Sequence, residues 1–203
     1  MMRSRGLLAG GALLGAVLAL AGCTGAGGGA GTDAGPGVAN FPGGDQTLTL
    51  LAPDKRPTPG VLRGKTVDGG TVDVADYKGH AVVLNVWGSW CPPCQAEARD
   101  VQAASQQLAG EGVKFLGINV RESGGTAAAQ AFQRTYGITY PSLYDENSDY
   151  LLALRGVVSA NAIPSTVVLD PQGRVAARFS GKITKTTLVD VVHDVLANRT
   201  PTS

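Results

Sequence analysis

Two cysteines spaced as C-x-x-C are the residues of this chain best suited to chemistry, and they lie in the segment Trp90-Cys91-Pro92-Pro93-Cys94. A helix is predicted to begin at Pro92, because proline is favoured in a first helical turn. Cys91 would then sit at the helix N-terminus, where free N–H groups and the positive end of the dipole favour a nucleophilic thiolate. Cys91 is therefore the candidate nucleophile. Cys94, one turn later, is placed to resolve a mixed disulfide between Cys91 and a substrate.

The two prolines between the cysteines, Pro92 and Pro93, carry no backbone N–H, so fewer hydrogen bonds can reach the thiolate than in a Gly-Pro motif. A structural disulfide and half of a zinc site are alternative interpretations of a lone C-x-x-C. Zinc fits poorly, because the chain has no second C-x-x-C, and His80 and His193 lack ligand-like spacing. We expect redox chemistry, with neither a cofactor nor a bound metal.

The composition is that of a globular protein with one folded domain and an attached extension. The chain has 203 residues, of which 16% are charged, and its formal net charge is +1. No basic block is present, so nucleic acid is not an expected partner. Three cysteines are too few for a disulfide scaffold, and the third one, Cys23, stands far from the pair.

The N-terminus has the features of an export signal. Two arginines precede an apolar run over residues 7–21, which is shorter than the roughly 20 residues of a membrane-spanning helix. The run ends in Leu20-Ala21-Gly22-Cys23, which resembles the lipobox of bacterial lipoproteins. The resemblance implies a signal peptide over residues 1–22, a lipidated Cys23 and a location on the outer side of the bacterial cell membrane. A thioether-linked sulfur would take no part in thiol chemistry.

Beyond the lipobox, composition and patterning divide the chain in two. Residues 23–45 are rich in Gly and Ala and are predicted to be a flexible tether, and residues 46–199 form the folded domain. An apolar strand over residues 81–87 leads into the motif. The other predicted elements are a β-hairpin over 61–74 with its turn at 68–70, helices over 92–108, 127–136, 148–154 and 185–197, and strands over 113–120, 142–144, 166–169 and 174–179. This order predicts a mixed α/β sheet with helices on both faces.

Residues 83–97, read as VLNVWGSWCPPCQAE, resemble the active-site segment of the TlpA/ResA-type thioredoxin-like proteins, and the resemblance extends over roughly residues 45–198. It implies a thioredoxin-like fold with an N-terminal β-hairpin and a helical insertion around residues 127–136 and 140–145. It also implies thiol–disulfide exchange with protein substrates.

The segment over residues 162–170 is similar to the cis-proline strand of the same family. The resemblance implies a cis bond before Pro164 and a backbone at Ile163 that binds the substrate peptide. Such a bond would leave backbone groups beside the dithiol free for β-like pairing with a substrate. A trans proline that merely starts a strand is the alternative.

Four further residues around the motif acquire roles by resemblance. Asn85 stands where ordinary thioredoxins have a buried Asp, and it cannot titrate. Glu97 is on the same helical face as Cys94 and matches a carboxylate near the dithiol of the family, which implies a proton acceptor for Cys94. The alternative for Glu97 is a solvated surface residue. Trp87 matches a core aromatic, and Trp90 matches one that covers the thiols and contacts substrate.

The resemblance implies a membrane-tethered, monomeric reductase that keeps exported proteins in the thiol state, such as apocytochrome c before haem attachment. This reductase would take electrons from a membrane donor of the thiol–disulfide transporter type. An oxidase or isomerase is one alternative, since the Pro-Pro pair does not exclude it. A non-enzymatic binding protein or copper chaperone is another, although copper-delivery relatives usually carry C-x-x-x-C with a partner His. A peroxidase would call for a lone peroxidatic cysteine, which is also missing.

Overall fold

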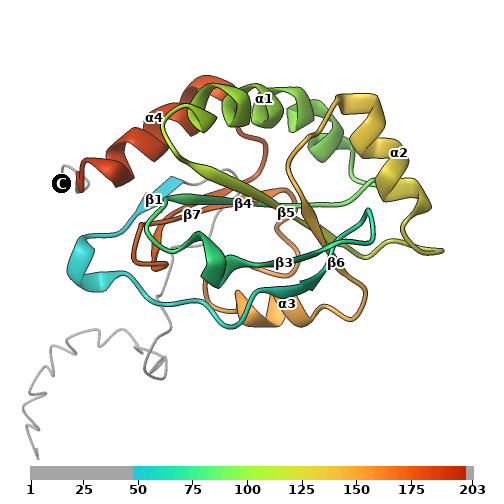
Figure 1. The fold of residues 1–203 in the computed structure, drawn as a ribbon, viewed down its shortest axis with the longest axis horizontal. Helices are drawn as coiled ribbons and strands as arrows, with labels where there is room; N and C mark the ends of the chain where they lie inside the picture. Colours follow the sequence, from blue (N-terminus) through green and yellow to red (C-terminus); the bar gives the residue numbers. More distant parts are fainter. Residues whose placement is uncertain (1–47, 200–203) are drawn as a thin grey trace, which may run out of the picture. The chain divides into compact units, whose positions relative to one another are not determined.

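The structure is a computed structural model that describes residues 48–199, and its centre is a six-stranded mixed sheet (Figure 1). The strands run in the order β1-β8-β7-β4-β5-β6. Their bounds are β1 (Leu48–Leu50), β4 (Val82–Trp87), β5 (Lys114–Val120), β6 (Ser142–Asp145), β7 (Ser165–Leu169) and β8 (Val175–Ser180). Strand β4 is parallel to β5 and antiparallel to β7. Every residue of β4 is buried, which explains why its sequence is almost continuously apolar.

Helices cover both faces of the sheet, as the patterning predicts. Figure 1 shows α1 (Pro92–Ala109) and α4 (Lys185–Leu196) side by side on one face and α3 (Asp149–Ala153) on the other. The alternation of side chains along β4 builds a core on each side. Val83 packs in the cluster that includes residues of α1 and α4, whereas Leu84 packs in the cluster that includes Leu151 of α3. Helix α2 (Ala127–Tyr136) follows β5. The predicted thioredoxin-like α/β fold is confirmed.

The predicted β-hairpin is present as a separate two-stranded sheet of β2 (Arg63–Lys65) and β3 (Thr71–Asp73). Its turn contains Gly69 at φ 88°, a backbone angle that favours glycine. A single bridge from Thr66 to Leu143 connects the hairpin to β6. The hairpin therefore lies at the same edge of the main sheet as α2 and β6.

The sequence patterning missed three short elements: strand β1 and the 3-10 turns η1 (Pro53–Lys55) and η2 (Val74–Tyr77). Strand β1 has only three residues, and its pairing with β8 joins segments about 130 residues apart, which local patterning cannot reveal. The predictions for residues 1–22, for the tether over 23–45 and for Cys23 lie outside the described residues. Within residues 48–199, no helix is long and apolar enough to cross a membrane.

A buried ion-pair network fixes the entry to the domain. The Arg56 guanidinium lies 3.2 Å from the Asp170 carboxylate and also donates a hydrogen bond to Asn198. Arg174 lies 2.8 Å from the same carboxylate. Asp170 thus connects the segment before the hairpin to the β7–β8 turn, and Arg56 extends the connection to the end of α4.

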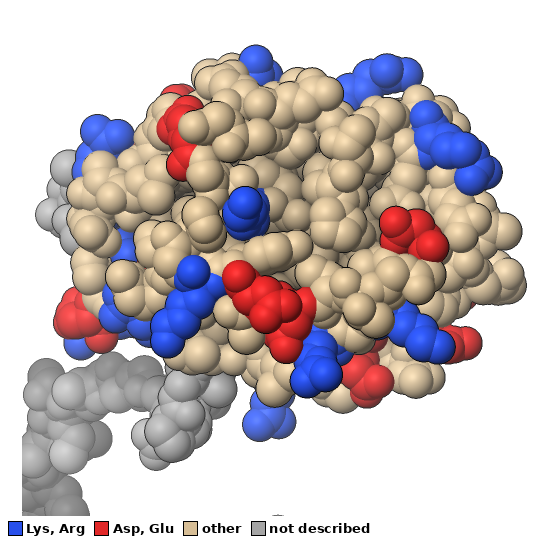
Figure 2. All heavy atoms as spheres, in the orientation of Figure 1, with Lys and Arg blue, Asp and Glu red and all other residues tan. Residues whose placement is uncertain are grey.

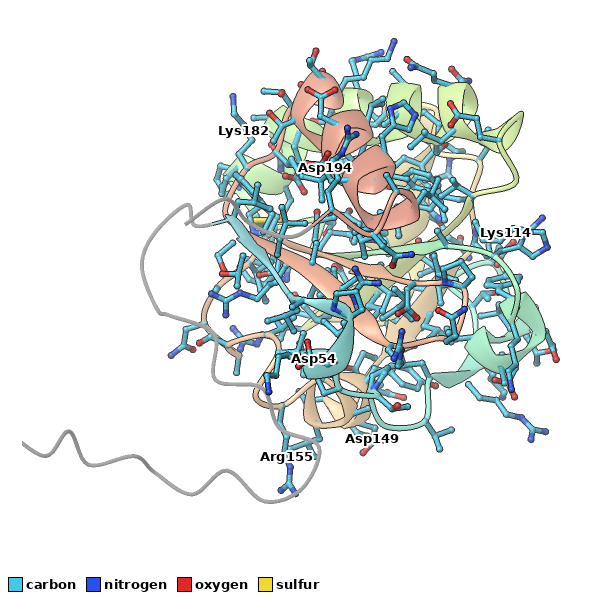
Figure 3. All side chains as sticks on the ribbon, turned by 90° about the vertical axis from the view of Figure 1, so that its left-hand side faces the viewer. Asp54, Lys114, Asp149, Arg155, Lys182 and Asp194 are labelled. Atoms are coloured by element: carbon cyan, nitrogen blue, oxygen red, sulfur yellow. A yellow bond between two sulfur atoms is a disulfide. The ribbon has the colours of Figure 1, made fainter. Side chains whose placement is uncertain are left out.

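Charges of both signs are distributed over the surface. On the face drawn in Figure 2, Lys and Arg side chains are interspersed with Asp and Glu side chains. In Figure 3 the labelled side chains of Lys114 and Arg155 point outward from two different parts of the ribbon. The face drawn in Figure 2 therefore offers no large patch of a single sign to a polyanion.

Candidate active site

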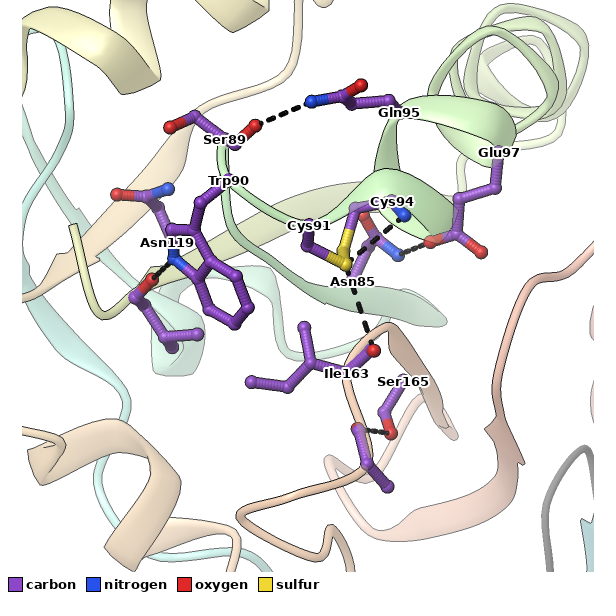
Figure 4. The surroundings of a disulfide bond; sticks show 12 residues. Asn85, Ser89, Trp90, Cys91, Cys94, Gln95, Glu97, Asn119, Ile163 and Ser165 are labelled. Carbon is purple, nitrogen blue, oxygen red and sulfur yellow. Dashed lines mark hydrogen bonds between the residues drawn. A yellow bond between two sulfur atoms is a disulfide. The ribbon is translucent and has the colours of Figure 1, made fainter.

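The C-x-x-C motif occupies the N-terminus of α1, where the sequence places it (Figure 4). Cys91 is the N-cap residue, and its sulfur accepts a hydrogen bond from the Cys94 N–H at 3.3 Å. Because Pro92 and Pro93 have no N–H, the amide of Cys94 is the first one that the helix offers to this sulfur. The two cysteines form a disulfide with their Cα atoms 5.2 Å apart. The motif is thus present in its oxidised form.

The cis-proline loop lies directly opposite the disulfide. The Ile163–Pro164 bond is cis, as the resemblance implies, and it immediately precedes β7. The Cys91 sulfur is 3.7 Å from the Ile163 carbonyl oxygen, although 72 residues separate the two in sequence (Figure 4). The antiparallel pairing of β4 with β7 produces this juxtaposition, because the end of β4 then meets the start of β7. A backbone carbonyl at this position can contact a peptide that presents its sulfur to Cys91.

Both cysteines are only 1% exposed, whereas Pro92 and Pro93 between them are exposed. The adjacent Trp90 is 47% exposed. The two prolines and the indole therefore form the exposed surface next to the disulfide. The substrate-binding roles of these three residues stay predictions, while their placement around the sulfur atoms agrees with such roles.

Glu97 is almost completely buried, at 1% exposure, so its interpretation as a solvated surface residue is wrong. One carboxylate oxygen accepts a hydrogen bond from the Asn85 side chain at 2.9 Å, and the other accepts one from the Ile183 N–H at 2.9 Å. Burial raises the pKa of Glu97 to about 7, although the hydrogen bonds from Ile183 and Asn85 oppose the rise. A carboxyl group with this pKa can accept and release a proton near neutral pH. Its role as proton acceptor for Cys94 remains a proposal.

Asn85 joins the helix to the sheet beneath the motif. Its side chain is buried, and besides Glu97 it donates a hydrogen bond to the Thr166 hydroxyl of β7 at 3.3 Å. The amide carries no titratable proton at this position, so Glu97 is left as the buried carboxyl group of the site. In Figure 4 the Glu97 carboxylate is turned toward Asn85, about one helical turn beyond Cys94.

The two tryptophans have different environments. Trp87 is buried and stacks on Phe132 of α2, with ring centroids 4.4 Å apart, in agreement with its predicted place in the core. The Trp90 indole folds back over Gly88, where a Cβ atom would approach its Nε1 to 2.6 Å. The same Nε1 donates a hydrogen bond to the Val120 carbonyl at 3.2 Å. The end of β5 therefore holds the indole beside the disulfide.

Sequence reasoning missed a carboxylate that supports the loop before Cys91. Glu122 accepts hydrogen bonds at 2.7 Å from both the N–H and the hydroxyl of Ser89, and a third at 2.8 Å from the Asn119 side chain. The Ser89 carbonyl in turn accepts a hydrogen bond from Gln95 of α1. The sequence signal that could have identified Glu122 is the polar run that follows the strand predicted over residues 113–120. It becomes informative only once β5 is known to be parallel to β4, since parallel strands end at the same edge.

Within the described part of the chain, no group of three or more His, Cys, Asp or Glu residues could hold a metal ion. His80 and His193 both lie away from the motif. His193 of α4 is within 3.0 Å of Glu111, which follows α1. The His80 ring lies near Gly112, at the start of β4.

Comparison with known proteins gives concordant results. Residues 54–178 match the AhpC/TSA family. The chain is 29% identical over 129 residues to the thiol-disulfide oxidoreductase ResA of Bacillus subtilis, and this alignment covers 64% of the chain and 66% of ResA. It is 31% identical to ResA of Geobacillus thermodenitrificans, over 59% of the chain and 65% of that protein. The chain thus spans slightly less than two thirds of these relatives.

Two solved structures share the fold over almost their whole length. A DsbF homologue from Corynebacterium diphtheriae is 36% identical with a TM-score of 0.68, and the match covers 78% of this chain and 99% of the homologue. A secreted thiol-disulfide isomerase from Corynebacterium glutamicum is 33% identical with a TM-score of 0.71, and the match covers 80% of this chain and 98% of the isomerase.

Proposed function

The chain belongs to the AhpC/TSA family, and from this membership we propose that it is a thiol–disulfide oxidoreductase that reduces disulfides in exported proteins. The observation that carries the proposal is the Cys91–Cys94 disulfide at the N-terminus of α1, facing the Ile163 carbonyl at 3.7 Å. The names of the relatives, thiol-disulfide oxidoreductase and thiol-disulfide isomerase, support the same chemistry.

In the proposed reaction the reduced protein attacks a substrate disulfide. The Cys91 thiolate forms a bond to one substrate sulfur, and the other substrate sulfur leaves as a thiolate that takes up a proton. Cys94 then gives its proton to Glu97 and attacks the Cys91 sulfur, which releases the second substrate sulfur as a thiolate that takes up a proton. Two electrons have passed to the substrate, and the Cys91–Cys94 disulfide has formed. A thiol donor must reduce this disulfide before the next cycle, and we propose a membrane protein of the thiol–disulfide transporter type.

The hydrogen bonding of the Cys91 sulfur favours the reductive direction. A disulfide is strongly oxidising when its reduced thiolate is well stabilised. Pro92 and Pro93 remove two amide donors, so the Cys94 N–H, 3.3 Å from the sulfur, is the first helix amide left to stabilise a Cys91 thiolate. Weak stabilisation of the thiolate makes the dithiol a better reductant. Apocytochrome c before haem attachment is the substrate that we propose.

An oxidase or isomerase is the second candidate, because one of the similar solved structures is a secreted thiol-disulfide isomerase. The redox state of the pair in living cells separates the two directions. Rapid acid quenching followed by alkylation should find Cys91 and Cys94 largely reduced if the protein is a reductase. A stable disulfide in growing cells would contradict the reductase and support the second candidate.

Substitution of the resolving cysteine tests the exchange mechanism itself. In a Cys94→Ala variant the mixed disulfide cannot be resolved, so exported substrates should accumulate covalently bound to Cys91. The matched control is Cys91→Ala, which retains one cysteine of the motif but lacks the nucleophile and should trap nothing. Mass spectrometry of the trapped species identifies the substrates. If Cys94→Ala traps no more protein than Cys91→Ala, the proposed mechanism is wrong.

We further propose that residues 1–22 are a lipoprotein signal peptide, that Cys23 carries the lipid and that residues 23–45 tether the domain over residues 46–199 to the outer side of the membrane. The lipobox-like segment and the secreted state of the C. glutamicum relative support this location. A Cys23→Ser variant should lose the lipid mass and leave the membrane fraction. Retention of that variant in the membrane would contradict the anchor.

A further inference from the structure

The turn that follows β5 contacts both loops that border the disulfide. On one side, the Glu122 carboxylate accepts hydrogen bonds from the Ser89 N–H and hydroxyl, both at 2.7 Å, two residues before Cys91. On the other side, the Arg121 guanidinium donates a hydrogen bond to the Ala160 carbonyl, three residues before Ile163. Two consecutive side chains thus reach the dithiol loop and the cis-proline loop, respectively.

The backbone of this turn explains how neighbouring side chains can serve opposite loops. Arg121 has φ 57°, in the left-handed region that residues with a Cβ rarely adopt. This conformation changes the direction of the chain directly after β5. Strained backbone of this kind concentrates at functional sites, where the surrounding contacts maintain it. Here those contacts are the hydrogen bonds of Arg121 and Glu122.

Further hydrogen bonds hold the turn and the segments on either side of the disulfide. The Asn119 side chain donates a hydrogen bond to Glu122 at 2.8 Å, and the Val120 carbonyl accepts one from the Trp90 indole at 3.2 Å. On the cis-proline side, the Ala162 N–H donates a hydrogen bond to the Ser159 carbonyl at 3.0 Å, which closes the turn that contains Ala160. The end of β5 and the turn that follows it, residues 119–122, therefore contact both loops.

We propose that Arg121 and Glu122 are positioning residues, which hold the dithiol loop and the cis-proline loop at the separation that a protein substrate needs. The inference rests on the proposed function, because the separation matters only when a substrate backbone contacts Ile163 while its sulfur meets Cys91. That separation is 3.7 Å between the Cys91 sulfur and the Ile163 oxygen. A displacement of about 1 Å in a reacting pair can cost about a hundredfold in rate.

Three variants of the full-length protein test whether Arg121 and Glu122 hold the two loops in place. Glu122→Ala removes the acceptor for Ser89. Glu122→Gln keeps it without the charge, because the amide oxygen can accept from the Ser89 N–H and the NH₂ group can donate to the Ser89 hydroxyl. Arg121→Gly removes the contact with Ala160 while adopting φ 57° without strain.

Two matched controls leave the hydrogen bonds of Arg121 and Glu122 in place. Ser148 has a similar backbone angle, φ 64°, at the start of α3, and its side chain makes no capping hydrogen bond. Ser148→Gly therefore controls for the relief of backbone strain in Arg121→Gly. Glu146 is exposed in the same connection, so Glu146→Ala controls for the loss of a carboxylate.

The measurement compares two substrates of the reduced proteins: insulin, a protein disulfide, and a small aromatic disulfide that needs no contact with Ile163. Glu122→Ala and Arg121→Gly should each lower the rate constant for insulin by about tenfold, with a much smaller effect on the small disulfide. Glu122→Gln should recover most of the loss. The two controls should behave like the unsubstituted protein.

The inference is overturned if Glu122→Ala and Arg121→Gly both keep the wild-type ratio of the two rate constants. It is also overturned if Glu122→Gln lowers the rate constant for insulin as much as Glu122→Ala does, because the charge of Glu122 and not its hydrogen bonds would then be responsible. Far-UV circular dichroism establishes that each variant is folded. If Glu122→Ala is not folded, the variant Ser89→Ala, which removes one of the same hydrogen bonds, takes the place of Glu122→Ala in the comparison. A wild-type protein that reduces the small disulfide but not insulin would instead overturn the proposed function, and this inference with it.

Discussion

The burial of Glu97 predicts a specific dependence of stability on pH. Both oxygens of this carboxylate are hydrogen-bonded, yet desolvation prevails and raises the pKa from 4.5 to about 7. Ionisation in the folded protein then costs about 3 kcal/mol more than in the unfolded chain, from about 1.4 kcal/mol for each tenfold change in the equilibrium.

The sign follows from proton binding. Below pH 4.5 the group is protonated in both states, so it contributes no dependence on pH. Between pH 4.5 and about 7 only the unfolded chain releases the proton, so the free energy of unfolding decreases as the pH rises. Above that range both states are ionised, and the full loss of about 3 kcal/mol remains.

A Glu97→Gln variant removes this dependence. The Gln oxygen can accept the Ile183 N–H, and a rotated Asn85 amide can accept from the Gln NH₂ group, so the buried hydrogen bonds can be kept. Urea denaturation of the oxidised proteins from pH 4 to 8.5 gives the free energy of unfolding at each pH. Relative to the wild-type protein, the variant should gain stability progressively across this range and by up to about 3 kcal/mol at the alkaline end.

The control for this comparison is Glu146→Gln, which removes a carboxylate that is exposed. The reasoning is refuted if the difference in unfolding free energy between Glu97→Gln and wild type is the same at every pH. That result would mean that burial does not raise the pKa of Glu97, and its proposed role as a proton acceptor near neutral pH would lose its physical basis.

Three further substitutions test the packing that positions the site. Asp170→Asn should lower the free energy of unfolding by about 3 kcal/mol at neutral pH, because it leaves the buried Arg56 without its counter-charge. Burial would raise the pKa of Asp170, but hydrogen bonds from Arg174 and Arg56 outweigh it and lower the pKa, so the difference measured by calorimetry should shrink as the pH falls through the acid range. Gly117→Ala should lower the free energy of unfolding by about 1–3 kcal/mol in a urea titration, because its Cβ would clash with the Ser142 side chain in a buried part of the sheet. Phe132→Ala should cost about 3–5 kcal/mol and alter the near-UV circular dichroism of the tryptophan that it stacks on, whereas an unchanged spectrum would contradict the stacking.

The elements next to the motif were predictable from local patterning. The apolar run before Cys91 forms β4, and α1 begins at Pro92 as expected, because the pattern of a fully buried strand and the preference of proline for a first turn are both local properties. Strand β1 was not predicted, because three residues are too few to show an alternating pattern and their partner, β8, lies far along the chain.

The environments of the two acidic residues at the site depended on the fold. A Glu on a helix is usually solvated, and only the packing of α1 against the sheet and the loop before α4 encloses Glu97, with Asn85 and Ile183 as its partners. Glu122 lies 31 residues beyond Cys91, and its contact with Ser89 exists because β5 runs parallel to β4 and ends at the same edge.

The C-x-x-C pair at the start of a helix is a local property of the chain, because spacing and helix geometry bring the two sulfur atoms together, and it therefore predicts thiol chemistry from the sequence. What faces the dithiol depends on the tertiary structure. The Ile163 carbonyl, the buried Glu97 carboxyl and the support from Arg121 and Glu122 reach the site from other strands and loops. Contacts between segments so distant in sequence follow from strand order and register, which no local pattern contains.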